Sequence, residues 1–296
     1  MSAIAKKTAA ILALVLSLFA CTQEKPPAVT GIVEANSAYL QHFGKPPAVK
    51  AGKAFARVGY LPLRDQHDRL GAVPLYLFDE KDQLPRLLDR LVSGELTLPT
   101  DSQLYNPFLP DTKAQVAASS EKALTLSLNV AETGSYDPMP MVNALVETAA
   151  QFDDIERVIV LLNGQPVTRM PDAGFTSDRE RIADAAPPEL IMVAGIWDEG
   201  AVTLDEIAVN FDRPITVHSF SLTHADGTKI EGDYFVSAFQ MSVVVHPGKP
   251  EIFQDGTVLQ VQWEVVDALG RVGRGWQVTP LKRIVHEARL GKFIKK

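Results

Sequence analysis

Three histidines and one acidic cluster are the side chains whose types and spacing could do chemistry. His218, His224 and His246 lie in the C-terminal half, and imidazole nitrogens bind a metal such as zinc when several of them converge. Histidines at strand ends are more often surface residues, and His224 falls beyond the strand expected to carry His218. We therefore predict no metal site.

The acidic cluster comprises Asp153, Asp154 and Glu156, and paired carboxylates can act as general acid and base. They follow a predicted helix and adjoin Arg157, which favours a solvated turn over an active site. The sequence contains no G-x-S-x-G elbow, no phosphate-binding glycine loop, no H-E-x-x-H pair and no dinucleotide fingerprint. We predict a protein that is not an enzyme, with no catalytic residues and no cofactor.

The single cysteine, Cys21, points to a different chemistry. Because the chain has no second cysteine, Cys21 forms neither an intramolecular disulfide nor a cysteine-based metal cluster. It follows two lysines, the apolar run Thr8 to Leu16 and the small residue Ala20, which is the order of an export signal. Residues 18–21, Leu-Phe-Ala-Cys, resemble the lipobox of bacterial lipoproteins. The resemblance implies that the signal peptide, residues 1–20, is removed by cleavage between Ala20 and Cys21, and that Cys21 is then lipidated.

A lipid on Cys21 would hold the protein at a membrane surface while its body faces water. The apolar run itself is shorter than the roughly 20 residues that span a bilayer. We expect a lipid-anchored envelope protein facing the periplasm or the cell exterior. Thr22 follows the cysteine, and a residue other than Asp there favours the outer membrane where the cell has one. The net charge of −7 does not favour nucleic-acid binding.

Residues 21–50 are predicted to be the lipid anchor and a proline-containing spacer. Two Lys-Pro-Pro triplets, at Lys25 and Lys45, interrupt a segment with little apolar periodicity, and such segments are semi-extended. The alternative is that residues 38–40 belong to a short helix packed on the first domain.

Residues 51–170 have the mixed pattern of an α+β domain. Strict alternation of apolar and polar residues over 124–130 predicts a strand with one buried face. An Asn163-Gly164 pair after an apolar run predicts a hairpin turn. The strand candidates are 55–63, 73–78, 124–130 and 157–162, and the helix candidates are 84–92 and the segment from Pro138 to Phe152.

This order of elements, with four short motifs, resembles the GerMN domain of sporulation and spore-germination proteins. The motifs are Leu-Thr-Leu-Ser-Leu-Asn-Val at 124–130, Asn-Ala-Leu-Val-Glu-Thr at 143–148, Ile-Glu-Arg-Val at 155–158 and Asn-Gly-Gln-Pro-Val at 163–167. The resemblance covers residues 55–168. It implies helices packed on a sheet and brings no catalytic residues with it.

Residues 171–189 are predicted to be a linker with a short helix after Ser177. From Leu190 onward, short apolar stretches alternate with turn signals such as Asp226-Gly227, which predicts an all-β sandwich over 190–281. The strand candidates are 207–211, 215–222, 239–245, 258–266 and 276–279.

The stretches 204–227 and 256–267 resemble the immunoglobulin-like sandwich of periplasmic copper-resistance CopC proteins. That family's Asp-Gly-His is replaced here by Asp-Ala-Leu-Gly at 267–270. The resemblance therefore implies the fold without the copper ligand.

Residues 282–296 are predicted to be a basic tail. The basic residues that set it apart from the acidic body are Lys282, Arg283, Arg289, Lys292, Lys295 and Lys296. Such a tail could contact a lipid surface or an acidic partner. The alternative is a terminal helix packed on its own domain.

The sequence thus predicts a GerMN-like α+β domain followed by an all-β immunoglobulin-like sandwich, both tethered through Cys21. We expect non-catalytic modules that bind or scaffold an envelope protein. The alternative function is a periplasmic carrier of a ligand or metal, with copper as the first candidate. A cell-wall enzyme has no residue constellation to support it.

Overall fold

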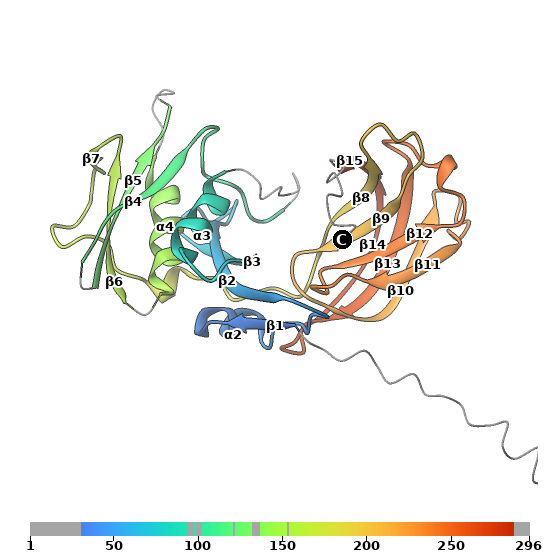
Figure 1. The fold of residues 1–296 in the computed structure, drawn as a ribbon, viewed down its shortest axis with the longest axis horizontal. Coiled ribbons are helices and arrows are strands. Elements are labelled where there is room, and N and C mark those ends of the chain that lie inside the picture. The colour runs from blue at the N-terminus through green and yellow to red at the C-terminus, as the bar shows by residue number, and fades with distance from the viewer. Residues whose placement is uncertain are drawn as a thin grey trace, which may run out of the picture.

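The computed structural model describes residues 31–93, 98, 102–120, 122–131, 137–152 and 154–286. They form two lobes joined by a linker (Figure 1), and their secondary structure is mostly strand with few helices. No helix within these ranges is long and apolar enough to cross a membrane. Ala20, Cys21 and the predicted signal peptide lie outside them.

The first lobe contains two small sheets with helices between them. Its elements are β1 (Ile32–Ala35), α2 (Ser37–Phe43), β2 (Lys53–Pro62), β3 (Leu70–Leu77), α3 (Gln83–Val92), β4 (Lys113–Ser120), β5 (Lys122–Asn129), α4 (Met139–Ala150), β6 (Ile155–Leu162) and β7 (Gln165–Pro166). The sheets have the orders β1-β2-β3 and β4-β5-β6-β7. In Figure 1, α3 and α4 lie between the sheets, and their apolar faces share one core with β5 and β6. The first lobe is therefore an α+β unit.

The apolar spacing of the sequence explains these elements. Leu87, Leu88 and Leu91 are buried on one face of α3, and alternate residues of β5 are buried because successive strand side chains point to opposite faces. At the end of β6, Asn163 and Gly164 have φ values of 49° and 80°, as the predicted hairpin turn into β7 requires.

The prediction that residues 21–50 form only an anchor and a spacer is wrong over residues 32–43. β1 pairs in parallel with β2, and α2 buries Tyr39 and Phe43 in a core shared with β2 and β3. Asn36 caps α2, because its side-chain oxygen accepts a hydrogen bond from the Tyr39 amide at 3.0 Å. The alternative helix around residues 38–40 is therefore the arrangement found.

The second lobe is all-β apart from one short 3₁₀ turn among its described residues. Its strands are β8 (Leu190–Asp198), β9 (Glu206–Phe211), β10 (Thr216–His224), β11 (Gly232–Val236), β12 (Ser242–Pro247), β13 (Val258–Val266), β14 (Val272–Pro280) and β15 (Lys282–His286). They form a five-stranded sheet, β11-β12-β9-β8-β15, and a three-stranded sheet, β10-β13-β14. Both sheets contribute to one buried core around Trp197, Phe211 and Trp263.

The predicted basic tail is wrong over residues 282–286. These residues form β15, which pairs in parallel with β8 at the edge of the five-stranded sheet. The rest of the predicted tail, with Arg289, Lys292, Lys295 and Lys296, lies outside the described residues.

Candidate functional site at the junction of the two lobes

Asp267 organises the turn between β13 and β14 at the junction. One of its carboxylate oxygens, Oδ1, accepts hydrogen bonds from the backbone amides of Leu269 and Arg271, both at 3.0 Å. Gly270 completes the turn with φ of 80°, a conformation that favours glycine. The Asp267 side chain is only 1% exposed, so its charge requires compensating partners.

Two arginines supply that compensation. Nε of Arg271 lies 2.6 Å from Oδ2 of Asp267, and Nη1 of Arg213 lies 3.7 Å from the same oxygen. Arg213 follows β9, is itself buried, and also donates from Nε to the Asp212 carboxylate at 2.9 Å. The buried charges therefore form a network within the second lobe.

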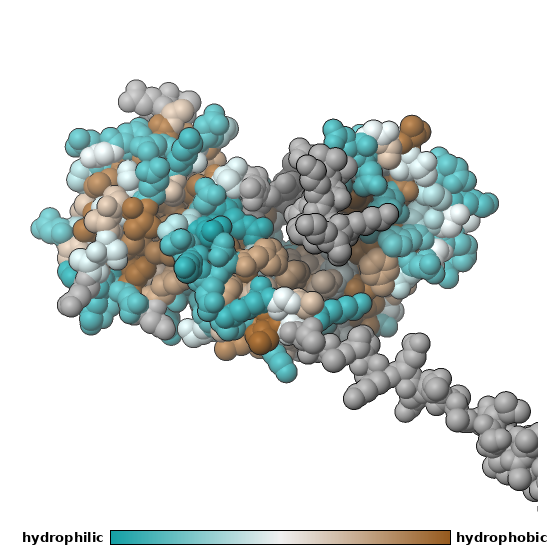
Figure 2. All heavy atoms as spheres, viewed as in Figure 1, coloured by the Kyte–Doolittle hydropathy of each residue, from teal (hydrophilic) through white to brown (hydrophobic). Residues whose placement is uncertain are grey.

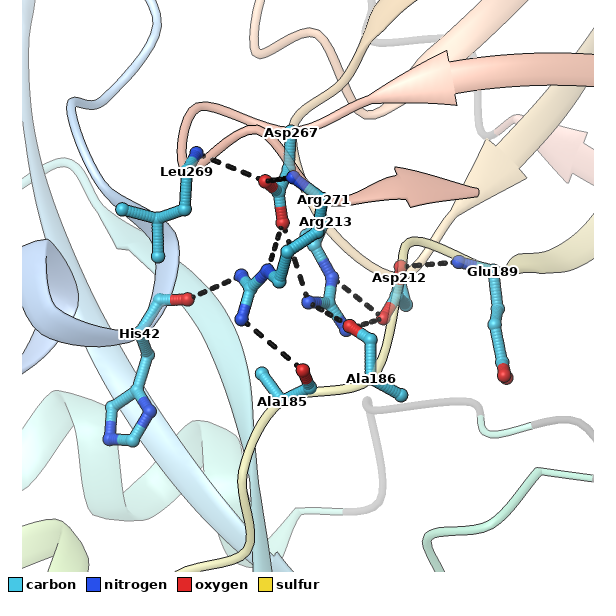
Figure 3. A network of polar contacts seen from close by, with 9 residues as sticks. All are labelled: His42, Ala185, Ala186, Glu189, Asp212, Arg213, Asp267, Leu269 and Arg271. Atoms are coloured by element: carbon cyan, nitrogen blue, oxygen red, sulfur yellow. Dashed lines mark hydrogen bonds and ion pairs between the residues drawn. The ribbon is translucent and has the colours of Figure 1, made fainter. Parts of the chain in front are cut away.

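The same two guanidinium groups reach outside the second lobe (Figure 3). Arg271 donates from Nη2 to the main-chain carbonyl of His42 at 2.7 Å, in the last turn of α2, where helix carbonyls lack partners. Arg213 donates from Nη1 to the carbonyl of Ala186 in the linker at 2.8 Å. One buried carboxylate thus orients the groups that connect α2, the linker and the second lobe.

The His42 side chain is buried beneath this contact. Its Nε2 lies 3.1 Å from the hydroxyl of Tyr60 in β2. Burial lowers the pKa of His42, and the positive charges of Arg271 and Arg213 lower it further. Burial raises the pKa of Tyr60. The pair is therefore held in its neutral forms, an imidazole and a phenol.

The linker is fixed to α4 of the first lobe by Glu147. This buried carboxylate accepts a hydrogen bond from Oγ of Ser177 at 2.6 Å and another from the amide of Asp178 at 2.7 Å. Arg181 adds a bond from Nη1 to the Asn143 side chain. The linker is therefore packed against the first lobe as well as against the second.

A cavity of about 460 Å³ lies where these parts meet. Its polar lining includes His42, Tyr60, Glu147, Arg179 and Arg271. The buried groups among them bond to one another or to the linker. These bonds fix the two lobes in one relative orientation.

The histidines considered for metal binding do not converge. His218 lies 3.7 Å from Glu264, His246 lies 3.4 Å from Glu206, and the ring of His224 stacks on Phe253. Within the part of the chain that the structure describes, no group of three or more His, Cys, Asp or Glu side chains could hold a metal ion.

The other side chains singled out from the sequence also lie apart from the junction. Glu156 forms an exposed ion pair with Lys122 at 2.6 Å, and Asp153 lies outside the described residues. Lys282 and Arg283 lie in β15, where the Arg283 guanidinium stacks 4.8 Å from the centre of the Trp197 ring. Their role in partner or membrane contact stays a prediction, as does the lipidation of Cys21.

Sequence reasoning missed the junction residues Asp267, Arg213 and Arg271. The available signal was local: Asp267 and Arg271 flank a Gly-containing turn four positions apart, a spacing that lets the carboxylate cap the turn. The contact with His42 had no local signal, because it joins segments at opposite ends of the chain.

Comparison with known proteins identifies the class of the first lobe. Residues 60–168 match the model of the Germane family, described as sporulation and spore germination. The predicted resemblance to the GerMN domain is therefore confirmed over residues 60–168, the part of the first lobe that the family model matches. No curated protein matches the sequence.

Solved structures with similarity to the chain are distant. The first GerMN domain of the sporulation protein GerM from Bacillus subtilis is 22% identical, with 42% of this chain and 93% of that chain covered and a TM-score of 0.32. The tandem GerMN domains of the same protein are 17% identical, with 60% and 58% covered and a TM-score of 0.33. CopC from Methylosinus trichosporium OB3b is 11% identical, with 32% and 94% covered and a TM-score of 0.24.

Proposed function

We propose that this chain is a lipid-anchored envelope protein that presents two domains, in one fixed arrangement, to another envelope protein. Lipid on Cys21 holds it at the membrane. The GerMN domain and an immunoglobulin-like sandwich formed by the second lobe then act as non-catalytic binding or scaffolding modules. The step from domain type to role is an analogy with the family description, since a fold alone does not define a function.

The observation that supports a joint role for the domains is the junction. Domains that act independently are usually joined by exposed linkers that few contacts cross. Here the linker is bonded to both lobes, and Arg271 bridges from the second lobe to α2 of the first. A partner that contacts both lobes would therefore meet a preorganised surface, which lowers the entropic cost of binding.

The two sheets of the second lobe support the sandwich assignment. They enclose a single core, to which β13 contributes Val261 and Val265 and β9 contributes Val209 and Phe211. Two antiparallel sheets around a shared core are the architecture of immunoglobulin-like domains. The parallel pairing of β15 with β8 is an addition at one edge.

Chemical crosslinking in intact cells, followed by affinity purification of the full-length protein, tests the proposal. We expect the wild type and an Arg274→Ala control, which alters only an exposed pair with Glu264, to recover the same envelope proteins. An Arg271→Ala variant, with the junction weakened, should recover several-fold less of them. Recovery of no envelope protein above background would reject the proposed role, and equal recovery by both variants would reject the need for a fixed junction.

The anchor is tested separately by Cys21→Ser. We expect the wild-type protein in the membrane fraction with acyl mass on Cys21, and the variant in the soluble fraction with its fold intact. Retention of the folded variant in the membrane would reject lipid on Cys21 as the anchor.

A further inference from the structure

An exposed apolar groove lies where the two lobes meet near the start of the described chain. This aromatic groove, of about 580 Å³, is lined by residues 48–54, by Phe78 after β3 and by residues 235–240 at the β11–β12 turn. Phe78 is 67% exposed, and Phe235 and Val236 are 44% and 42% exposed. A cluster of large apolar side chains in contact with water marks an interaction surface more often than isolated ones do.

Ring contacts between the lobes hold the groove in shape. Phe239 of the second lobe packs against Tyr76 and Phe78 of the first, with ring centres 4.4 and 5.8 Å apart. Phe239 and Met241 also pack against the core beneath β2 and β3. Packed contacts between the two lobes therefore form the groove.

Charges of both signs lie beside the groove. Lys53, at the start of β2, lies 3.0 Å from both Glu34 and Glu80. The protein as a whole is acidic, which disfavours an anionic polymer as the occupant. The surface therefore fits an apolar occupant, and its attraction would come from buried apolar area.

The first described residues of the chain lie beside the groove. The amide of Ile32 donates to the carbonyl of Gly52 at 2.9 Å, and Gly31 lies directly against Val49, so the described chain begins beside the wall of the groove. Ile32 is itself 59% exposed. Figure 2 shows hydrophobic side chains at the surface along the lower edge of the molecule, where β1 and α2 lie in Figure 1.

Cys21 precedes Gly31 by ten residues. Ten residues span at most about 35 Å even when fully extended. Lipid on Cys21 would therefore keep the groove within that distance of the bilayer. A tether of this length gives a surface contact a high effective concentration, so even a weak apolar contact becomes populated.

We infer that the rim of the aromatic groove docks on the lipid surface in which Cys21 is anchored. Phe78, Phe235 and Val236 enter the boundary between headgroups and acyl chains, which apolar side chains penetrate by about 5–10 Å. The inference rests on the lipid anchor of the proposed function. Docking would set the orientation of both lobes on the membrane and leave the far face of the protein for the partner.

A tryptophan probe in the full lipidated protein tests this docking. Phe78→Trp and a control, Val202→Trp, are each purified in lipidated form and reconstituted into phosphatidylcholine vesicles with ordinary or brominated acyl chains. Val202 is a suitable control because its side chain is 92% exposed and it lies before the first residue of β9. The groove lies near the other end of β9, where the Phe211 amide donates to the carbonyl of Met241, the residue after the groove lining. The emission of Trp197, Trp263 and Trp276 in the wild type is subtracted as background.

We expect the added emission of Phe78→Trp to shift to the blue and to be quenched by brominated lipid at least about twofold more than that of Val202→Trp, because bromine quenches only rings at acyl depth. Since the contact is apolar, quenching should persist at high salt.

Equal quenching of the two variants, with acyl mass present on Cys21, overturns the docking and leaves the anchor intact. Absence of acyl mass overturns both. A blue shift in native membranes without quenching in pure lipid assigns the groove to a protein partner and overturns the inference.

Discussion

Arg271 and His42 are 229 positions apart in the chain, yet the guanidinium of Arg271 donates a 2.7 Å hydrogen bond to the main-chain carbonyl of His42. The same guanidinium compensates the buried carboxylate of Asp267. One side chain therefore contributes both to the stability of the second lobe and to its contact with the first. This coupling explains why the two lobes should behave as one body.

Arg271→Ala should destabilise the second lobe. The change leaves the Asp267 carboxylate buried with Arg213 at 3.7 Å and two backbone amides as its remaining partners. Loss of one partner of a buried charge should lower the free energy of unfolding by about 2 kcal/mol. Urea unfolding followed by the fluorescence of the buried Trp197 and Trp263 measures it.

The matched control is Arg274→Ala, which removes an exposed pair with Glu264 at 3.1 Å. It should lower the free energy of unfolding by less than about 1 kcal/mol, because exposed ion pairs contribute little. Similar losses in the two variants would contradict a special role for Asp267 and its partners.

Glu147→Ala should release the linker from α4. The carboxylate that binds Ser177 and Asp178 is lost, and trypsin should then cleave after Arg179 or Arg181 more readily. A loss of about 1.5 kcal/mol in local stability corresponds to roughly tenfold faster cleavage when opening is rapid. Glu156→Ala, at an exposed pair with Lys122, serves as the control and should leave the cleavage rate unchanged.

His42 should make the protein less stable as the pH falls. Its pKa in the folded state is lowered by burial and by two arginines, so the unfolded chain binds more protons in the range below the ordinary histidine pKa. Stability contributed by neutral His42 is complete above pH 6.5 and is lost as the pH falls from there toward the folded-state pKa. Urea unfolding at several values between pH 8 and 5 should show a smaller pH dependence in His42→Gln than in the wild type. An unchanged slope would show that His42 titrates alike in both states.

The hydroxyl groups of Tyr39 and Tyr76 should be energetically coupled. They lie 2.7 Å apart in the core that joins α2 to β3, and burial raises the pKa of Tyr39 to about 12. Tyr39→Phe leaves a buried hydroxyl unpaired and should cost about 1 kcal/mol in the free energy of unfolding. Tyr39→Phe combined with Tyr76→Phe should cost less than the sum of the single changes. Additive losses in this double-mutant cycle would contradict the pairing.

Much of the first lobe could be predicted because the spacing of apolar residues in its helices and strands matches the faces that are buried. The alternating residues of β5 and the spacing in α3 each specify one buried face. β4 carried no such signal, since it is an exposed edge strand rich in Ala and Ser. The composition of the α2 segment, with prolines on both sides, concealed that Tyr39 and Phe43 complete a core built by β2 and β3.

The contacts that cross the junction could not be predicted, because Arg271 with His42 and Arg213 with Ala186 join groups far apart in the sequence. Arg213 and Arg271 occur in loops, where charged residues are ordinarily solvated, and the linker and α2 supply carbonyl partners for their guanidinium groups. Three-dimensional proximity of this kind is set by the path of the whole chain. A sequence motif specifies such a contact only where both partners lie within a few residues.

Gly273→Ala should disturb the packing of the linker against β14. A Cβ atom at Gly273 would lie 2.0 Å from the carbonyl oxygen of Pro188, so the linker or the strand would have to move. Such overpacking costs about 1–3 kcal/mol. Gly248→Ala is the control, because its nearest neighbour, the carbonyl oxygen of Glu231, would lie at 3.6 Å. Thermal unfolding should show a lower transition temperature for Gly273→Ala alone, and small-angle scattering should show a wider separation of the lobes. If both variants unfolded like the wild type, the linker would not be fixed on the second lobe through Pro188, and the single orientation of the two domains would lose one of its supports.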